Sequence, residues 1–391
     1  MQKRYIEGAM RADIEHKKMV FLAGPRQVGK TTLARDFARR HFPSVQYLNW
    51  DNAEHRRIIR TSYIREDADV VIFDELHKYE RWKRYLKGFY DVDDGRHAII
   101  VTGSARLDVY RRGGDSMQGR YHLFRLHPFS YAEVKKIMPS VKPFQPLVFH
   151  SASRDPILLA ALLRYGGFPE PFLSQDEDRA RRWRVERLER LVREDIRDLE
   201  HVHSLSTIEH LIDLLPEKVQ SLLSLNGLRE DLEVSHASIT LWMDILERMY
   251  YHYRLYPFSH KKIRSLKKEA KLYLWDWSEV VTPSAREENI IASHLLKFAH
   301  YLRDTAGYQA DLWYLRDRDG REVDFLMTVD GRPWFAVEVK HRDCTISNHL
   351  RYFAERIGIP FLYQVVFNDD VYSKKEGIVV VSADRFLSAF V

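Results

Sequence analysis

The stretch that decides the fold is Gly24-Pro25-Arg26-Gln27-Val28-Gly29-Lys30-Thr31-Thr32. It matches the pattern G-x-x-x-x-G-K-[ST] and lies between an apolar run over residues 19–23, which predicts a strand, and a helical pattern over residues 31–40. Its two glycines allow the backbone to turn so that successive N–H groups point at phosphate oxygens, and the positive end of the helix dipole adds to them. The stretch therefore predicts a phosphate-binding loop.

Side chains of this loop predict the nucleotide and its metal ion. Lys30 would reach the β and γ phosphates of ATP, and Thr31 offers a hydroxyl to Mg²⁺. A second motif supports this loop: two acidic residues, Asp74 and Glu75, follow the apolar run Val70-Val71-Ile72-Phe73. Asp74 would hold Mg²⁺ through water, and Glu75 would orient or deprotonate the water that attacks the γ phosphate. The alternative is a surface acid pair at the end of a buried strand.

Two further residues are candidates for sensing the γ phosphate. Ser104 follows the apolar run Ile99-Ile100-Val101-Thr102-Gly103, and we choose Ser104 over Thr102 for this role. Arg120 follows a glycine and could act as an arginine finger across a subunit boundary, which would require a homo-oligomer. A plain surface arginine is the alternative for that residue.

The first 130 or so residues alternate short β-branched runs with amphipathic stretches, and this pattern is typical of a parallel α/β sheet. The predicted strands are residues 19–23, 45–50, 70–73 and 98–102. We therefore predict the α/β fold of P-loop nucleoside triphosphatases for this part. With 391 residues the whole chain has room for two to four domains.

Helices dominate the middle of the chain. An arginine-rich helix over residues 179–197 could contact DNA, but its Glu186–Arg190 and Glu189–Arg193 spacings favour a solvated, salt-bridged face. Residues 221–256 have helix-turn-helix spacing, with Ser235 as the N-cap of the second helix. Its apolar stripe is Ile239, Trp242, Ile245, Leu246 and Met249. A basic segment with seven Lys/Arg and one acid follows over residues 254–271, where a wing facing DNA could lie.

The last part of the chain returns to mixed α/β structure. Strands are predicted at residues 272–275, 312–315, 323–328, 334–339 and 360–366. This part contains the motif D-x13-E-x-K, formed by Asp324, Glu338 and Lys340. Glu338 and Lys340 share one face of their strand, since residues i and i+2 point the same way. If the strand of Asp324 lies next to it, the three side chains can converge. Two carboxylates could bind a divalent metal, Mg²⁺ or Mn²⁺, and the lysine could steady the attacking water. Glu288 on the preceding helix and Gln364 on the next strand would support this site; an edge ion pair is the alternative.

The bulk composition sets limits on compartment and partners. With 62 basic and 56 acidic residues the net charge is +6, which permits contact with DNA without requiring it. No apolar run reaches the roughly 18 residues needed to cross a bilayer, so no membrane partner is expected. The single Cys344 cannot form an internal disulfide, and the first ten residues lack a secretory h-region. We therefore expect a cytoplasmic protein.

These residues together resemble the prokaryotic AAA+-like ATPases that carry the C-terminal domain DUF4143. The resemblance covers nearly the whole chain and rests on residues 21–32, 47–51, 119–120 with 128–130, and 166–170. The chain departs from the group at Ala105, where a serine is usual, and at residues 116–118. The resemblance implies an ATPase core, a winged-helix segment and a terminus similar to PD-(D/E)XK nucleases.

The resulting domain prediction has four parts. They are the ATPase domain at residues 1–135, a helical lid or linker at 136–215, a winged helix at 216–271 and a nuclease-like domain at 272–391. The predicted function is ATP binding and Mg²⁺-dependent hydrolysis coupled to a DNA-directed carboxy-terminal half. The alternatives are an ATP-dependent regulatory switch and a binding module whose nuclease-like fold is inactive.

Overall fold

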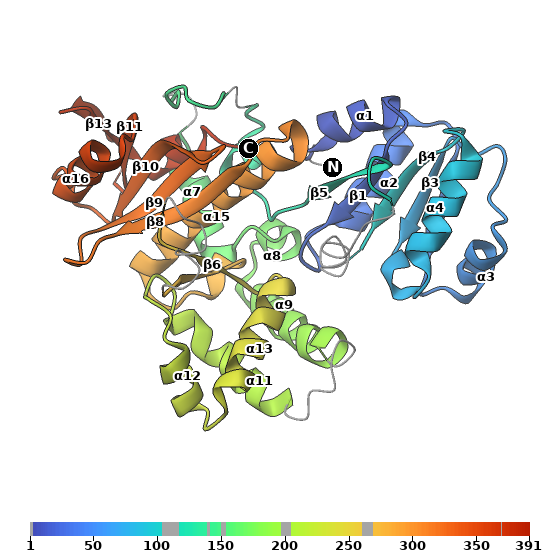
Figure 1. The fold of residues 1–391 in the computed structure, drawn as a ribbon, viewed down its shortest axis with the longest axis horizontal. Coiled ribbons are helices and arrows are strands. Elements are labelled where there is room, and N and C mark those ends of the chain that lie inside the picture. Colours follow the sequence, from blue (N-terminus) through green and yellow to red (C-terminus); the bar gives the residue numbers. More distant parts are fainter. Residues whose placement is uncertain are drawn as a thin grey trace. The chain divides into compact units, whose positions relative to one another are not determined.

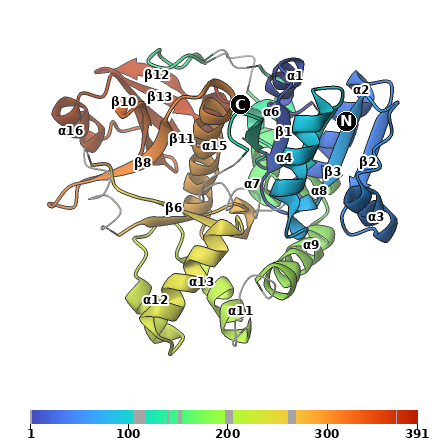
Figure 2. The ribbon, with the colours of Figure 1, turned by 45° about the vertical axis from the view of Figure 1, so that its right-hand side comes forward.

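The computed structural model describes residues 3–103, 117–138, 141–149, 154–196, 205–259, 269–368 and 370–391 (Figure 1). These residues form two compact units, Met1–His127 and Pro128–Val391. Figure 2 gives a second view of the ribbon. None of the helices within the described ranges is both long enough and apolar enough to cross a membrane.

A five-stranded parallel sheet forms the centre of the amino-terminal unit, in the order β2-β3-β4-β1-β5. Its strands are β1 (Met19–Ala23), β2 (Val45–Asn49), β3 (Val70–Asp74), β4 (Ala98–Thr102) and β5 (Tyr121–Arg125). The accompanying helices are α1 (Glu7–Glu15), α2 (Lys30–His41), α3 (Ala53–Thr61), η1 (Leu76–Lys78) and α4 (Trp82–Asp93). Every residue of β1 and β3 is buried, as expected for strands covered on both faces. The predicted α/β sheet is confirmed, and β5 is an additional strand.

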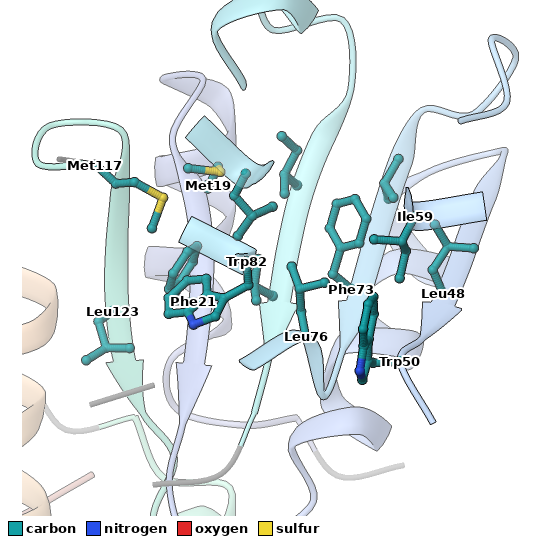
Figure 3. Packing of buried hydrophobic residues seen from close by; sticks show 14 of the residues in the cluster. Met19, Phe21, Leu48, Trp50, Ile59, Phe73, Leu76, Trp82, Met117 and Leu123 are labelled. Carbon is teal, nitrogen blue, oxygen red and sulfur yellow. The ribbon is translucent and has the colours of Figure 1, made fainter. Parts of the chain in front are cut away.

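Aromatic side chains build the core on one face of this sheet (Figure 3). The rings of Phe21 in β1 and Trp82 in α4 have centroids 6.1 Å apart. Phe73 in β3 meets Phe89 of α4 edge to face, with centroids 5.9 Å apart. These large apolar rings hold α4 against the sheet. Because all five strands run in one direction, the carboxyl ends of β1, β3 and β4 meet at one edge, which is where ligands bind in such sheets.

A six-stranded mixed sheet in the order β12-β13-β11-β10-β9-β8 organises the last part of the carboxy-terminal unit. Its strands are β8 (Ala310–Arg316), β9 (Glu322–Val329), β10 (Arg332–Lys340), β11 (Phe361–Val366), β12 (Tyr372–Lys375) and β13 (Ile378–Ser382). The 24-residue helix α15 (Pro283–Ala306) packs against this sheet, and α16 (Asn348–Ile357) and α17 (Ala383–Leu387) complete it. The predicted strands at residues 312–315, 323–328, 334–339 and 360–366 are confirmed.

Helices make up most of the remaining carboxy-terminal unit (Figure 2). They are α6 (Tyr131–Lys135), α7 (Pro156–Tyr165), α8 (Pro169–Ser174), α9 (Glu177–Arg190), η4 (Leu191–Ile196), α11 (Leu205–Leu214), η5 (Leu215–Glu217), α12 (Leu225–Asp231), α13 (His236–Arg248) and η6 (Trp277–Glu279). The strands β6 (His252–Leu255) and β7 (Lys271–Leu274) pair antiparallel after α13. Ser235 caps α13 by accepting a hydrogen bond from the Ser238 N–H at 3.0 Å. The predicted N-cap at Ser235 is confirmed, whereas residues 252–255, at the end of the predicted helix-turn-helix segment, form the strand β6.

The arginine-rich helix α9 has both a solvated and a buried side. The predicted pair Glu186–Arg190 is present at 3.3 Å on the exposed side. Arg187, in contrast, is buried, forms an ion pair with Glu279 at 2.9 Å and lies over the ring of Phe168. The alternation of charges predicted the solvated side, but it did not predict that one arginine turns inward.

Residues 128–135 pack within the carboxy-terminal unit, although the predicted ATPase domain extended to residue 135. The Lys297 ammonium of α15 forms a buried ion pair with Glu133 and donates to the Pro128 carbonyl at 3.1 Å. The Tyr131 N–H donates to the ring of His294 at 2.9 Å. These buried polar contacts fix α6 to α15, and the four-domain division itself stays a prediction.

The glycine pair at residues 166–167 lies against the same segment. The Phe129 N–H donates to the Gly167 carbonyl at 2.6 Å. A Cβ at Gly167 would lie 2.6 Å from the Phe129 carbonyl oxygen and 2.6 Å from the Trp277 ring. Neither a backbone atom nor a buried indole can move away cheaply, so only glycine fits this position.

Gly167→Ala is therefore expected to lower the free energy of unfolding of the carboxy-terminal unit by about 2 kcal/mol, in the range usual for overpacked interiors. Chemical denaturation followed by tryptophan fluorescence measures this change. The matched control is Gly227→Ala in α12, where a Cβ would meet only the Ser224 side chain at 3.5 Å or more. This control is expected to be neutral or slightly stabilising. Equal stability of the two variants would refute the packing argument.

Candidate functional site

The predicted phosphate-binding loop connects β1 to α2, and its strand–loop–helix context is confirmed. Gly24 and Gly29 have φ of 142° and 96°, a conformation that side chains with a Cβ rarely adopt. A Cβ on Gly24 would also overlap the Leu126 carbonyl oxygen. The backbone of the loop therefore depends on both glycines, as the sequence pattern predicted.

Lys30, the first residue of α2, is buried beside the loop. Its ammonium donates to the Gly24 carbonyl at 2.9 Å and to the Pro25 carbonyl at 2.6 Å. Both acceptors belong to the loop itself. The charge predicted to meet the phosphates is thus held directly at the loop that would cradle them.

Asp74, at the carboxyl end of β3, is a buried carboxylate with several donors. The Thr31 hydroxyl donates to its two oxygens at 3.1 and 3.2 Å. Further donors are the Tyr47 hydroxyl at 2.5 Å, the Asn49 amide at 3.1 Å and the Thr102 hydroxyl. Thr31 and Asp74 are therefore neighbours, and their oxygens are the ligand type that Mg²⁺ prefers.

Tyr47, Asn49 and Thr102 were not predicted from the sequence as neighbours of Asp74. Tyr47 and Asn49 alternate along β2, and Asn49 is in register with Asp74 of the parallel strand β3. Burial, with the hydrogen bond to Asp74, raises the pKa of the Tyr47 phenol to about 12, so it remains a donor. The period-two spacing of Tyr47 and Asn49, which puts both side chains on one face of β2, was the signal available. Ser104, the preferred sensor candidate, lies outside the described residues.

Glu75 follows Asp74 with a left-handed backbone, φ 55°. Its carboxylate lies 3.7 Å from the Lys78 ammonium and 3.6 Å from the His77 ring, and 25% of the side chain is exposed. Burial raises the pKa of Glu75, while the charges of Lys78, Lys30 and Arg26 lower it. Glu75 thus lies within electrostatic reach of the loop and remains accessible to water, as a residue that activates water must be.

Arg120 lies at the opposite edge of the sheet from this site. It precedes β5, whose Tyr121 pairs with Met19 at the start of β1, whereas the loop follows the end of β1. Its guanidinium binds both oxygens of Asp91, at 2.7 and 3.2 Å. Arg120 therefore does not serve the nucleotide site of its own chain, and a finger role toward another copy stays a prediction.

The second candidate site lies in the carboxy-terminal unit, where β9 and β10 are adjacent as predicted. The Val339 N–H donates to the Asp324 carboxylate at 2.8 Å, and Lys340 pairs with Glu338 at 2.7 Å. Burial, followed by the charge of Asp324, raises the pKa of Glu338 to about 7 and that of Glu288 to about 8. Asp324, Glu338 and Glu288 therefore form one carboxylate cluster, together with Glu322 described next.

Lys271, which was not predicted as a site residue, lies in this carboxylate cluster. Its ammonium is 2.5 Å from Glu322, 3.5 Å from Glu288 and 3.7 Å from Asp324, and its side chain is 3% exposed. In the sequence Lys271 was one of several cations in a basic segment, and nothing local marked it as buried. The cluster therefore already contains a cation.

Gln364, predicted to support the carboxylates, holds a loop in place. It pairs with Glu338 in the strand register, but its amide donates to the carbonyls of Asp343 and Thr345 at 3.2 and 2.9 Å. Its carbonyl oxygen accepts from the Ser347 N–H at 2.9 Å. Its side chain therefore positions the segment after β10.

Comparison with protein families assigns three matches along the chain. Residues 16–135 match an AAA domain, residues 157–282 match the domain of unknown function DUF8612, and residues 285–386 match the domain of unknown function DUF4143. The chain has the domains of an AAA+-like ATPase with a C-terminal DUF4143 domain. The predicted resemblance is confirmed.

Relatives that match most of this chain have low sequence identity to it. An uncharacterized protein of Methanocaldococcus jannaschii is 24% identical over 349 residues, which cover 83% of this chain and 76% of that one. An uncharacterized protein of Mycobacterium tuberculosis is 20% identical over 397 residues, covering 99% and 85%. Proteins similar to most of this chain therefore occur in distant prokaryotes.

Solved structures give weaker likenesses. A Walker-type ATPase of Pyrococcus abyssi is 14% identical with a TM-score of 0.44, covering 73% of this chain and 96% of that chain. The RuvB Holliday junction branch migration motor of Thermotoga maritima is 15% identical with a TM-score of 0.30, covering 64% and 87%.

The carboxylate cluster of the DUF4143 domain does not fit a divalent metal as it is arranged. Within the described part of the chain, no group of three or more acidic, histidine or cysteine side chains could hold a metal ion. One buried oxygen, Oε2 of Glu338, lacks a hydrogen-bond partner among the described residues and would suit a cation. The Lys271 ammonium among the other carboxylates opposes it, because like charges repel at such distances.

Proposed function

We propose that this chain binds ATP with Mg²⁺ and hydrolyses ATP at the loop of residues 24–32, with Asp74 and Glu75. The observation that carries the proposal is the pair formed by the Thr31 hydroxyl and the Asp74 carboxylate at 3.1 Å, beside a phosphate-binding loop. Lys30 and the AAA domain match support it. Measuring ATP turnover in Lys30→Ala and Glu75→Gln tests it: both variants should lose hydrolysis.

Each residue has a separate task in this proposal. The loop N–H groups and Lys30 bind the phosphates, and Thr31 and Asp74 hold Mg²⁺, which neutralises phosphate charge when bound. Tyr47, Asn49 and Thr102 keep the Asp74 carboxylate oriented. The Glu75 carboxylate accepts a hydrogen bond from the attacking water and directs its lone pair toward the γ phosphate.

We further propose that ATP turnover is coupled to DNA contact by the carboxy-terminal unit of a cytoplasmic protein. The helices α11 to α13 followed by the β6–β7 pair have the element order of a winged helix, which supports this. In a homo-oligomer, Arg120 of one copy would meet ATP held by another. A regulatory switch would instead give slow turnover and nucleotide-dependent binding.

Neutralising Lys261, Lys262, Lys267 and Lys268, which lie outside the described residues, is expected to weaken DNA binding. The slope of log affinity against log salt should become shallower by about 1 for each phosphate that the protein no longer neutralises. Fluorescence anisotropy with labelled duplex DNA measures both quantities. A matched control for the Lys261/Lys262 pair is Lys374→Gln with Lys375→Gln, two exposed lysines of β12. Binding that is insensitive to salt and to all four lysines would remove the DNA role from this segment.

A second candidate function for the DUF4143 domain is a binding platform with an inactive nuclease-like fold. The ion pairs of Lys271 with Glu288, Glu322 and Asp324 favour this candidate. Metal-dependent nuclease activity at Asp324, Glu338 and Lys340, with Mg²⁺ or Mn²⁺, is the competing proposal.

A further inference from the structure

We propose that Lys271 is the resident cation of the carboxylate cluster and that it closes the DUF4143 domain to divalent metal ions. This cluster is separate from the ATP site and does not depend on ATP chemistry. The ammonium of Lys271 faces Glu288 of α15 and Glu322 and Asp324 of β9.

The charges in the cluster account for the burial of this lysine. A buried ammonium is costly unless carboxylates pair with it, and three do so within 4 Å. The fourth carboxylate, Glu338, pairs with Lys340 at 2.7 Å. Glu322 also binds Arg316 at 2.6 Å. Every carboxylate of the cluster therefore already has a cationic partner in the chain.

The backbone of Lys271 fixes the direction from which its side chain enters. Lys271 pairs with Leu255 in the β6–β7 ladder, and a bridge joins it to Leu222 on the other side. Its ammonium lies 5.8 Å from the centre of the Tyr314 ring, which adds a cation–π contact. Pairing on both sides of the strand fixes the direction of the Cα–Cβ bond of Lys271, and the three carboxylates hold its ammonium in the cluster.

A divalent ion bound by Asp324 and Glu288 would thus lie within a few ångströms of a fixed positive charge. The repulsion acts on the carboxylates that such an ion needs, so the ion and the ammonium compete for the same oxygens. Removing the charge while keeping the length of the side chain should open the cluster. Lys271→Met makes this change.

The test is Mn²⁺ binding followed by electron paramagnetic resonance in nucleotide-free protein carrying Asp74→Asn, which removes the other divalent site. The parent protein is expected to bind no Mn²⁺ at the cluster. Lys271→Met should gain one ion per chain, with affinity at least tenfold above the parent, and adding Asp324→Asn should abolish that gain. Lys271→Arg keeps the charge and should gain nothing.

Three results would overturn the proposal. The first is Mn²⁺ binding by the parent protein that Asp324→Asn abolishes. The second is Mn²⁺-dependent DNA cleavage by the unmutated chain that Asp324→Ala abolishes while ATP hydrolysis persists. The third is a folded Lys271→Met protein that gains no ion. If Lys271→Met fails to fold, as judged by circular dichroism, Lys271→Gln provides the same test with a polar side chain.

Discussion

Lys30→Ala is expected to abolish ATP hydrolysis and to weaken ATP binding, with turnover falling by roughly 100-fold or more. The variant removes a side-chain charge that the structure holds directly on the loop carbonyls of Gly24 and Pro25. Without it, the β and γ phosphates lose their main countercharge in the loop. Phosphate release and binding of a fluorescent ATP analogue measure the two effects.

The control for this variant lies on the same helix. Arg39 of α2 is exposed, and Arg39→Ala removes one positive charge without touching the loop. Its turnover is expected to stay within about twofold of the unmutated protein, because exposed charges at this distance are screened by salt. A folded Lys30→Ala protein with normal turnover and affinity would rule out the loop as the ATP site.

The parts of the nucleotide site that could be predicted are those whose functional residues lie close together in the sequence. The loop needs glycines at fixed spacing, a lysine and a hydroxyl residue, and all of these lie within residues 24–32. Asp74 and Glu75 were found because an apolar run ends in them. Tyr47 and Asn49 were not assigned because their role depends on β2 lying next to β3, and strand order cannot be read from a single strand.

In the carboxylate cluster, too, residues from neighbouring segments were predictable and a residue from a distant segment was not. Asp324 and Glu338 were predictable because a hairpin brings two nearby strands together. Lys271 comes from a strand of the separate β6–β7 pair, and only the three-dimensional arrangement puts it among the acids. Charge spacing along the sequence therefore indicated the carboxylates but not the cation that lies among them.

The edge strand β12 and the glycines at residues 166–167 were understood only from the structure. β12 has exposed, charged residues and lies at the edge of its sheet, so its sequence lacks an apolar signal. Gly167 matters because of Phe129 and Trp277, which are distant in sequence. Long-range packing, which no local pattern encodes, decides such positions.

Glu75→Gln is expected to keep ATP bound while slowing hydrolysis by two orders of magnitude or more. The amide keeps the size of the side chain but cannot accept the proton of the attacking water. ATP affinity should hold, because the phosphates and Mg²⁺ are bound by the loop, Lys30, Thr31 and Asp74. Single-turnover hydrolysis and equilibrium ATP binding separate the two quantities.

Asp74→Asn provides the contrast that assigns the two adjacent acids. Because Asp74 contacts Thr31, its amide variant should lose Mg²⁺-dependent ATP affinity, whereas Glu75→Gln should lose only the rate of hydrolysis.

The pH dependence of hydrolysis gives a further test of Glu75. Burial raises the pKa of Glu75, so as the pH falls the unmutated protein should lose hydrolysis at a higher pH than it would with an ordinary glutamate. Glu75→Gln should remove that pH dependence. Normal hydrolysis by Glu75→Gln would mean that another group activates the water.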